Sequence, residues 1–218
     1  MSEQQKYNLP REIIYLKQKL NDPRFRLPAG ESHKKMVPTV EGKPFRNMIA
    51  PSGSKQSAVM ILVIGMPEFS DFEILFTLRH NQMRSHSGQI SFPGGRLDVG
   101  ENHTEAALRE TQEEVGISSN DIEVIGQISP IYVPPSNSNI QPVIGYIPEI
   151  PELVLSAKEV EEAFMVKMSA LQNDELRKWK PWEFKGGVRA DVPYFDVHSS
   201  VPLWGATAIM MSEFLDIF

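Results

Sequence analysis

One continuous apolar segment limits the folds open to this chain: residues 58–65 read AVMILVIG. A run of this length, rich in β-branched side chains and ended by glycine, is typical of a strand that is covered on both faces. The next apolar segment, 72–79 (FEILFTLR), alternates instead, and places Ile74, Phe76 and Leu78 on one face. Together the two segments predict neighbouring strands of a sheet that is buried between other layers.

The rest of the chain shows strand patterns and helix patterns in mixed order. The expected elements are helices at 10–20, at 103–115 and in the C-terminal WGATAIMMSEFLDIF, strands at 122–128 and 140–147, a short strand and a short helix within 157–175, and a hairpin over 181–197. Pro142 is expected at an edge or bulge, since proline cannot donate to a ladder. Trp204 is expected to pack inward from an amphipathic terminal helix. Such an order implies an α/β or α+β layered domain with a mixed sheet.

The N-terminal quarter differs from the remainder of the chain. Beyond the helix at 10–20, residues 23–56 are rich in Pro, Gly, Ser and Lys and show no periodicity. We therefore expect an N-terminal helix and irregular arm over 1–55 and one domain over 56–218.

Composition excludes several classes of protein. With 28 acidic and 22 basic side chains the net charge is −6, which argues against a general nucleic-acid binder. The absence of cysteine excludes disulfides, thiolate zinc sites and a cysteine nucleophile. The longest apolar run is about half the length that a membrane-spanning helix needs, and the start MSEQQKYNL lacks the features of a signal peptide. We expect a cytoplasmic protein with neither nucleic acid nor membrane as a partner.

The charge is strongly segregated along the chain. Residues 74–97 contain no Asp or Glu, whereas residues 98–114 contain six acids and a single base. The basic and titratable side chains of the first stretch are Arg79, His80, Arg84, His86 and Arg96, and the acids of the second are Asp98, Glu101, Glu105, Glu110, Glu113 and Glu114. The pattern is that of an anion-binding stretch followed directly by an acidic one.

Three of these acids share one face of the predicted helix at 103–115. Glu110, Glu113 and Glu114 stand at i, i+3 and i+4, within an arc of about 100°. Like charges at these spacings repel by about 0.2–0.5 kcal/mol per pair. The last two also lie at the negative end of the helix dipole, just before Gly116, which costs about 0.3–1 kcal/mol. A solvated helix face is the ordinary alternative, but a divalent cation would offset these costs, and oxygen ligands favour Mg²⁺ or Mn²⁺.

The stretch from Gly95 to Ile117 resembles the box of the Nudix hydrolase family, G-x5-E-x7-R-E-U-x-E-E-x-G-U. The matching positions are Gly95, Glu101, Arg109, Glu110, Glu113, Glu114, Gly116 and Ile117. Thr111 stands where the pattern has a bulky aliphatic residue. The resemblance implies an α/β/α sandwich with a mixed sheet, dependence on Mg²⁺ or Mn²⁺, and hydrolysis of a nucleoside diphosphate linked to another moiety.

The same resemblance implies roles for the acidic residues. Glu110, Glu113 and Glu114 would hold the metal, helped by the carbonyl group of Gly94 or Gly95. Arg109 would orient the carboxylates.

The catalytic carboxylates would include Glu101, whereas the catalytic base stays open. It would be a glutamate of the box or one from the later stretch Glu159, Glu161 and Glu162. We expect that later stretch to be the solvated start of a helix.

Upstream, the sequence resembles the coenzyme A diphosphatase branch of the family, L-L-T-x-R-[SA]-x3-R-x3-G-x3-F-P-G-G. The matching residues are Leu75, Thr77, Arg79, Arg84, Gly88 and Phe92-Pro93-Gly94-Gly95, and the departures are Phe76 and His80. The segments RSHSGQ (84–89) and LWGATA (203–208) are also similar to that branch. The resemblance implies hydrolysis of coenzyme A to 3′,5′-ADP and 4′-phosphopantetheine.

We expect the acid-free stretch to bind the phosphates of this substrate, since Arg makes bidentate contacts with phosphate. The candidate substrate-binding residues are Arg79, Arg84, His86, Gln89 and Arg96, of which His86 either contacts phosphate or packs the loop.

Three alternatives remain open: action on another nucleoside diphosphate derivative such as ADP-ribose or NADH, a non-catalytic ligand-sensing Nudix module, and a metal-binding protein of unrelated fold. The expected partner is a small nucleotide, and a homodimer stays open.

Overall fold

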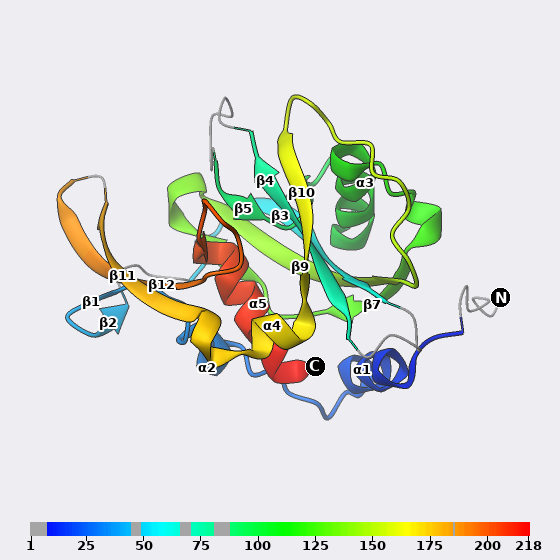
Figure 1. Cartoon of the computed structure of the whole chain (residues 1–218), viewed down its shortest axis with the longest axis horizontal. Coiled ribbons are helices and arrows are strands. Elements are labelled where there is room, and N and C mark those ends of the chain that lie inside the picture. Colours follow the sequence, from blue (N-terminus) through cyan, green and yellow to red (C-terminus); the bar gives the residue numbers. More distant parts are fainter. Residues whose placement is uncertain (1–7, 45–48, 66–70, 81–87, 185) are drawn as a thin grey trace.

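A computed structural model describes residues 8–44, 49–65, 71–80, 88–184 and 186–218 of the chain (Figure 1). Arg84 and His86, two of the predicted substrate-binding residues, lie outside the described residues. Within the described part of the chain, no helix is long and apolar enough to cross a membrane.

A mixed sheet forms the centre of the molecule. Its main strands, in spatial order, are β10 (Val160–Lys167), β4 (Glu73–Arg79), β3 (Lys55–Ile64), β9 (Ser138–Ile147) and β7 (Glu123–Gln127). β3 and β9 run parallel, and the other pairs run antiparallel. The short strands β5 (Ile90–Ser91), β6 (Gly94–Arg96) and β8 (Ile131–Val133) pair with β4, β3 and β9 respectively. The strands predicted at 58–65, 72–79, 122–128 and 140–147 are confirmed.

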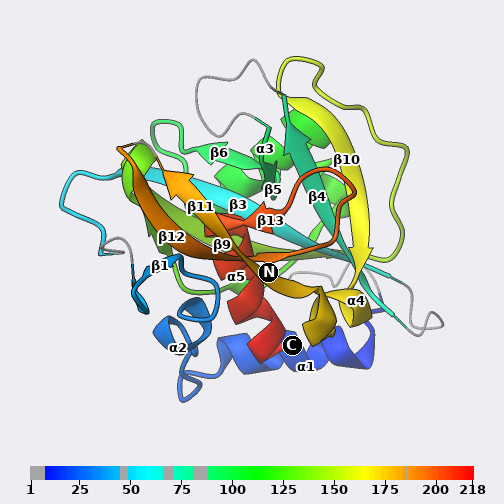
Figure 2. The same ribbon diagram turned by 60° about the vertical axis from the view of Figure 1, so that its left-hand side comes forward.

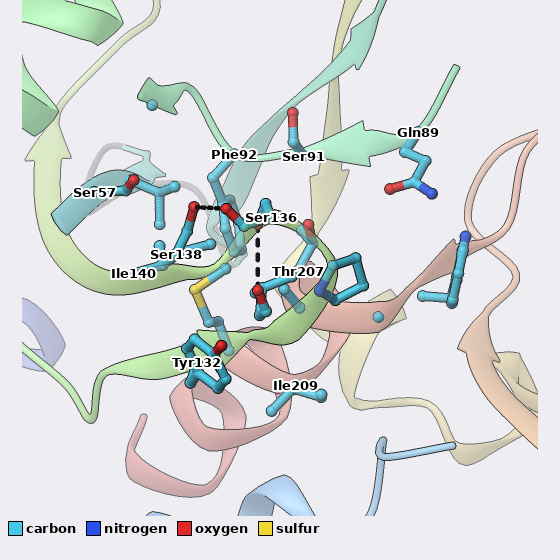
Figure 3. A pocket seen from close by; sticks show the side chains of 18 of the residues that line it. Ser57, Gln89, Ser91, Phe92, Tyr132, Ser136, Ser138, Ile140, Thr207 and Ile209 are labelled. Carbon is cyan, nitrogen blue, oxygen red and sulfur yellow. Dashed lines mark hydrogen bonds between the residues drawn. The ribbon is translucent and has the colours of Figure 1, made fainter. Parts of the chain in front are cut away.

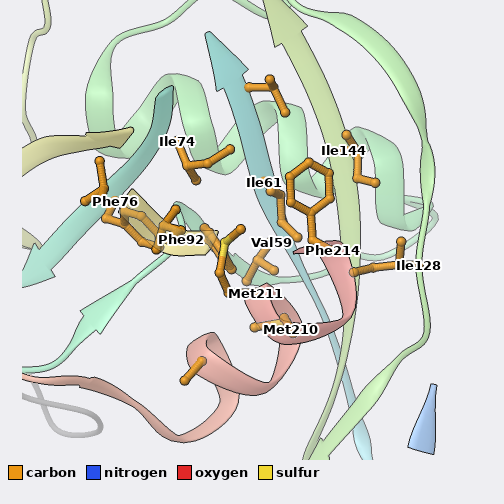
Figure 4. Close-up of a cluster of buried hydrophobic side chains, with 14 of the residues drawn as sticks. Val59, Ile61, Ile74, Phe76, Phe92, Ile128, Ile144, Met210, Met211 and Phe214 are labelled. Carbon is orange, nitrogen blue, oxygen red and sulfur yellow. The ribbon is translucent and has the colours of Figure 1, made fainter. Parts of the chain in front are cut away.

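Helices cover both faces of this sheet. Alternate residues of β3 point to opposite sides: Met60 belongs to a core cluster with Ala107 of α3 (His103–Val115). Ile61 belongs to a second cluster, with Phe214 of α5 (Gly205–Ile217) and with buried residues of α1 (Arg11–Asn21). Figure 4 shows β3 side chains packed against α5 in this second cluster. The continuous apolar run thus has the two-sided burial expected of it, and the α/β/α arrangement is confirmed.

A smaller sheet lies beside the first. It contains β11 (Arg177–Phe184), β12 (Val188–Phe195), β1 (Thr39–Val40), β2 (Lys43–Pro44) and β13 (Leu203–Trp204). β11 and β12 form the predicted hairpin, and the short helix α4 (Met168–Gln172) follows β10 as expected. Figure 2 shows β1 and α2 beside α5, below β12 in this view.

The segment predicted to be an irregular arm contains regular structure. α2 (Gly30–His33) packs on α5, and β1 pairs with β12, with Thr39 opposite Asp191. These contacts are made with elements more than 140 residues away in the chain, so no local periodicity could indicate them.

Two further expectations were wrong. Pro142 lies inside β9, opposite Val59 of β3, and not at an edge. On its other side β9 changes partner from β7 to β8, so Pro142 falls between the two ladders, where its missing N–H is tolerated. The terminal helix α5 is not amphipathic, because every residue from Thr207 to Phe214 is buried.

Candidate active site

The acidic helix α3 has the bounds that the sequence predicts. At its start, the Asn102 side chain accepts hydrogen bonds from the N–H groups of Thr104 and Glu105, and the Glu105 carboxylate accepts from the Asn102 N–H. This is a capping box, which fixes the first turn. At its end, Gly116 has φ +80°, and a Cβ there would lie 2.8 Å from the Cβ of Val154. The capping box and the positive φ of Gly116 are local features that set both ends of the helix, and the close approach of Val154 also requires glycine at 116.

Arg109 organises the carboxylates of the box. Its Nε and Nη2 atoms donate to the two carboxylate oxygens of Glu101 at 2.9 and 3.0 Å. Its Nη1 atom donates to Glu110 Oε1 at 2.9 Å and to Glu113 Oε2 at 3.0 Å, and Nη2 also donates to the carbonyl oxygen of Arg96. These hydrogen bonds lower the pKa of Glu101 and raise that of Arg109. One guanidinium thus ties the helix to the loop before it.

The Gly94-Gly95 pair lets the backbone approach this helix closely. In β6, Gly94 lies opposite Val59 and Gly95 opposite Ala58. A Cβ added at Gly95 would lie 2.3 Å from Oε1 of Glu110, so a side chain there would displace the carboxylate. The Gly94 N–H donates to Glu114 Oε2 at 3.3 Å.

Glu114 is the most deeply placed carboxylate of the box, with 2% of its side chain exposed. Burial raises the pKa of Glu114 to about 7, against the opposing effect of Arg79, whose Nη1 atom lies 3.2 Å from Oε1. Burial also raises the pKa of Glu110. The arginines offset only part of the cost of burying these two carboxylates. A positive charge bound between Glu110 and Glu114 would therefore be favourable.

The carboxylate oxygens of Glu110, Glu113 and Glu114 are suitable ligands for a hard divalent cation, although each of these side chains is paired with an arginine in the structure. Among the described residues, no group of three or more Asp, Glu or His side chains is arranged to hold an ion as it stands. Arg109 engages Glu110 and Glu113, and Glu113 points outward with 59% of its side chain exposed. Glu110 and Glu114 are the inner pair, and Mg²⁺ is commonly bound through one or two carboxylates plus water and phosphate oxygens.

A further carboxylate reaches this cluster from outside the box. Glu159 raises the pKa of both Glu110 and Glu114 through its charge. Its backbone is held next to the site, since the Glu159 carbonyl accepts the N–H of His80 at 2.8 Å and Ser156 N–H donates to the carbonyl of Glu114 at 2.9 Å. The expected helix start was wrong: Glu159 precedes strand β10, whose pairing with β4 brings it here.

A cavity of about 900 Å³ opens beside the carboxylates (Figure 3). Strands of the central sheet and their loops, α5, the smaller sheet and the segment before β1 all contribute to its lining. Of the predicted site residues, Arg79, Gln89, Gly94, Gly95 and Arg96 line this cavity. Among the described residues that line it, none carries a carboxylate. Arg79 therefore belongs both to the cavity wall and to the glutamate cluster.

Other lining residues were not named as site residues from the sequence. They lie on β8, the start of β9 and the connection between them, at the end of β11, and at the junction of β13 and α5, and include Tyr132, Ser136, Ser138, Phe184, Trp204 and Thr207. Trp204 and Thr207 belong to the segment LWGATA, whose similarity to the branch was the sequence signal for them, whereas the place of the others depends on contacts between segments far apart in the chain.

A mixed sheet between helices, with a glutamate-rich helix packed on a Gly-Gly strand beside an arginine-lined cavity, defines a hydrolase of the Nudix class. A family model for the NUDIX domain matches residues 54–185, and the chain belongs to this family. It is accordingly a Nudix hydrolase, a pyrophosphohydrolase of nucleoside diphosphate derivatives, and the family generally uses divalent ions such as Mg²⁺ or Mn²⁺.

Individual relatives agree with this placement. The chain is 27% identical over 205 residues to Nudix hydrolase 3 of Caenorhabditis elegans, covering 87% of this chain and 84% of the relative. It is 32% identical over 160 residues to an uncharacterized Nudix hydrolase, NudL, of Escherichia coli, covering 73% and 80%. A MutT/nudix family protein from Enterococcus faecalis has a similar fold, with a TM-score of 0.50 at 17% identity over 79% of this chain and 65% of that one.

Proposed function

We propose that this protein hydrolyses the diphosphate linkage of coenzyme A or its derivatives, to 3′,5′-ADP and (acyl-)4′-phosphopantetheine. The observation that carries the proposal is the charge arrangement of the cavity. Arg79 and Arg96 line it and none of the described carboxylates does, while the buried carboxylates lie directly behind Arg79. A substrate with several phosphate groups fits this arrangement, because arginine binds phosphate oxygens in pairs.

Each residue has a defined task in this proposal. Glu110 and Glu114, with the exposed Glu113, would hold Mg²⁺ or Mn²⁺. The metal would neutralise charge on the diphosphate and lower the pKa of the attacking water. Arg79 and Arg96 hold and orient the phosphate oxygens. Arg109 keeps the carboxylates in place through the hydrogen bonds described above.

Glu159 is our candidate for the catalytic base. It lies at the carboxylate cluster yet is outside the box, and its own side chain is half-buried. The variant E159Q keeps the shape and removes the basic oxygen. We expect a fall in kcat of about 10²–10⁴-fold, with Mn²⁺ binding measured by calorimetry unchanged. A kcat within threefold of the wild type would move the role to a glutamate of the box.

A substrate panel tests the proposal against its alternatives. Coenzyme A, ADP-ribose and NADH are each incubated with the protein and Mg²⁺ or Mn²⁺, and kcat/KM is measured. We expect a clear preference for coenzyme A. A preference for ADP-ribose or NADH would assign a different substrate to the same site, and tight binding of any of them without turnover would indicate a ligand-sensing module.

A further inference from the structure

Two aromatic side chains form one wall of the cavity away from the carboxylates. Trp204 stands at the junction of β13 and α5, and Phe184 ends β11; both line the cavity. Their ring centroids lie 6.0 Å apart. Trp182 packs against Trp204 with centroids 4.6 Å apart and an interplanar angle of 33°, but Trp182 is not part of the cavity lining. Trp204 is thus supported on one side and borders the cavity on another.

This wall is joined to the phosphate-binding end through β5. The Thr207 hydroxyl, in the first turn of α5, donates to the carbonyl oxygen of Ile90 at 3.1 Å. One residue earlier, the carbonyl of Gln89 accepts the N–H of Arg79 at 3.0 Å. Figure 3 shows Gln89, Ser91 and Thr207 along the same cavity. A ligand whose phosphates contact Arg79 can therefore extend along β5 toward Trp204, and a cavity of about 900 Å³ is large enough for a nucleotide.

We propose that Trp204, with Phe184 at its edge, is the stacking surface for the nucleobase of the substrate. The proposal rests on the proposed function, in which the substrate is a nucleoside diphosphate derivative. An indole ring offers a flat π-face that matches a purine, and such stacking contributes strongly without requiring hydrogen bonds to the base.

Trp204 lies outside the part of the chain that the NUDIX family model matches. The model ends at residue 185, whereas β13 and α5 follow it. The box that holds the carboxylates is common to the family, so a base-binding wall built by the C-terminal segment would set which nucleotides this chain accepts.

The test compares two ligands that differ only in the base, AMP and ribose 5-phosphate, by calorimetry with the full chain in Mg²⁺. We expect the wild type and W204F to bind AMP at least about tenfold more tightly than ribose 5-phosphate. W204L should lose that difference while binding ribose 5-phosphate as before. F184L, which alters the edge of the wall, should reduce the difference without abolishing it.

Tryptophan fluorescence gives an independent readout. The emission should respond to AMP in the wild type and in W179F, a matched control at a side chain outside the cavity that is 61% exposed, and the response should be lost in W204F. Melting temperatures confirm that each variant is folded.

The inference would be overturned if the wild type bound AMP and ribose 5-phosphate with equal affinity, or if W204L kept the preference for AMP. It would also be overturned if W204L and F184L lost affinity for both ligands to the same extent. Failure here is distinguishable from failure of the proposed function. If coenzyme A is split while the preference for AMP does not depend on Trp204, the stacking surface is wrong and the reaction stands.

Discussion

Arg79 Nη1 lies 3.2 Å from Glu114 Oε1, and this contact joins the arginine-lined wall of the cavity to the acidic helix. The two residues come from the two oppositely charged stretches of the sequence. The strand β4 carries Arg79 to the end of the sheet where Glu114 closes the last turn of α3. The two oppositely charged stretches of the sequence thus meet at one site in the folded chain. The substrate experiences the electrostatic field of that site, which the net charge of −6 does not describe.

Removing the charge of Arg79 should weaken the handling of the diphosphate. For R79M we expect kcat/KM for coenzyme A to fall about 10- to 100-fold, because hydrogen bonds to charged groups contribute about 1.5–3 kcal/mol. Steady-state kinetics with Mg²⁺ measure it. The control R189M removes an arginine whose side chain is 82% exposed and should leave kcat/KM unchanged. A value for R79M within twofold of the wild type would contradict this role.

The variant G95A should damage the site and spare the fold. Its Cβ would lie 2.3 Å from Oε1 of Glu110, so the carboxylate must move away from its place beside Arg109. We expect Mn²⁺ affinity and kcat to fall by at least about tenfold. The control is G30A, where nothing lies within 4 Å of the added Cβ. If G95A keeps wild-type Mn²⁺ affinity, then Glu110 does not hold the metal from this position.

Glu213 should be a main anchor of the N-terminal segment. This fully buried carboxylate on α5 accepts hydrogen bonds from the Ala29 N–H at 3.1 Å, from His33 Nε2 at 2.8 Å and from the Ser129 hydroxyl at 2.7 Å. Each buried donor left without a partner costs about 1–3 kcal/mol.

We expect E213A to lower the free energy of unfolding in urea by about 3 kcal/mol, and the matched variant E213Q, which retains an acceptor oxygen, by about 1 kcal/mol. Equal losses in the two variants would show that packing, not hydrogen bonding, holds the segment.

Asp216 should make stability depend on pH in the acid range. Burial alone would raise its pKa, but hydrogen bonds from Lys35 and Ser32 outweigh burial and hold the pKa below its ordinary value. A lowered pKa in the folded state stabilises the protein above the unfolded pKa of about 3.9, and this stabilisation is lost as the pH falls through the folded value.

The variant D216N should therefore be less stable than the wild type at pH 7, and the gap should narrow below about pH 4. Urea unfolding at pH 7 and pH 3 measures both values. A gap of constant size would exclude the charged form as the cause.

The parts of the molecule that local sequence determines were predictable. The helix predicted at 103–115 has these bounds in the structure, with Gly116 at its end and Asn102, one of two cap candidates in the sequence beside Thr104, as its N-cap. The sequence did not separate Glu159 from Glu161, Glu162 or the glutamates of the box as the candidate base, since the place of Glu159 depends on the pairing of β10 with β4. Trp204 was expected simply to pack inward, because nothing in its neighbourhood indicates that Phe184 and Trp182 will meet it. Contacts between distant segments account for each of these differences.

The most direct measurement is the identification of products, by liquid chromatography and mass spectrometry, after coenzyme A is incubated with the protein and Mg²⁺. We predict 3′,5′-ADP and 4′-phosphopantetheine in equal amounts, and neither product from E114Q, which should keep the wild-type melting temperature within a few degrees. Coenzyme A recovered intact under conditions where the protein splits ADP-ribose, or E114Q acting as fast as the wild type, would contradict the account.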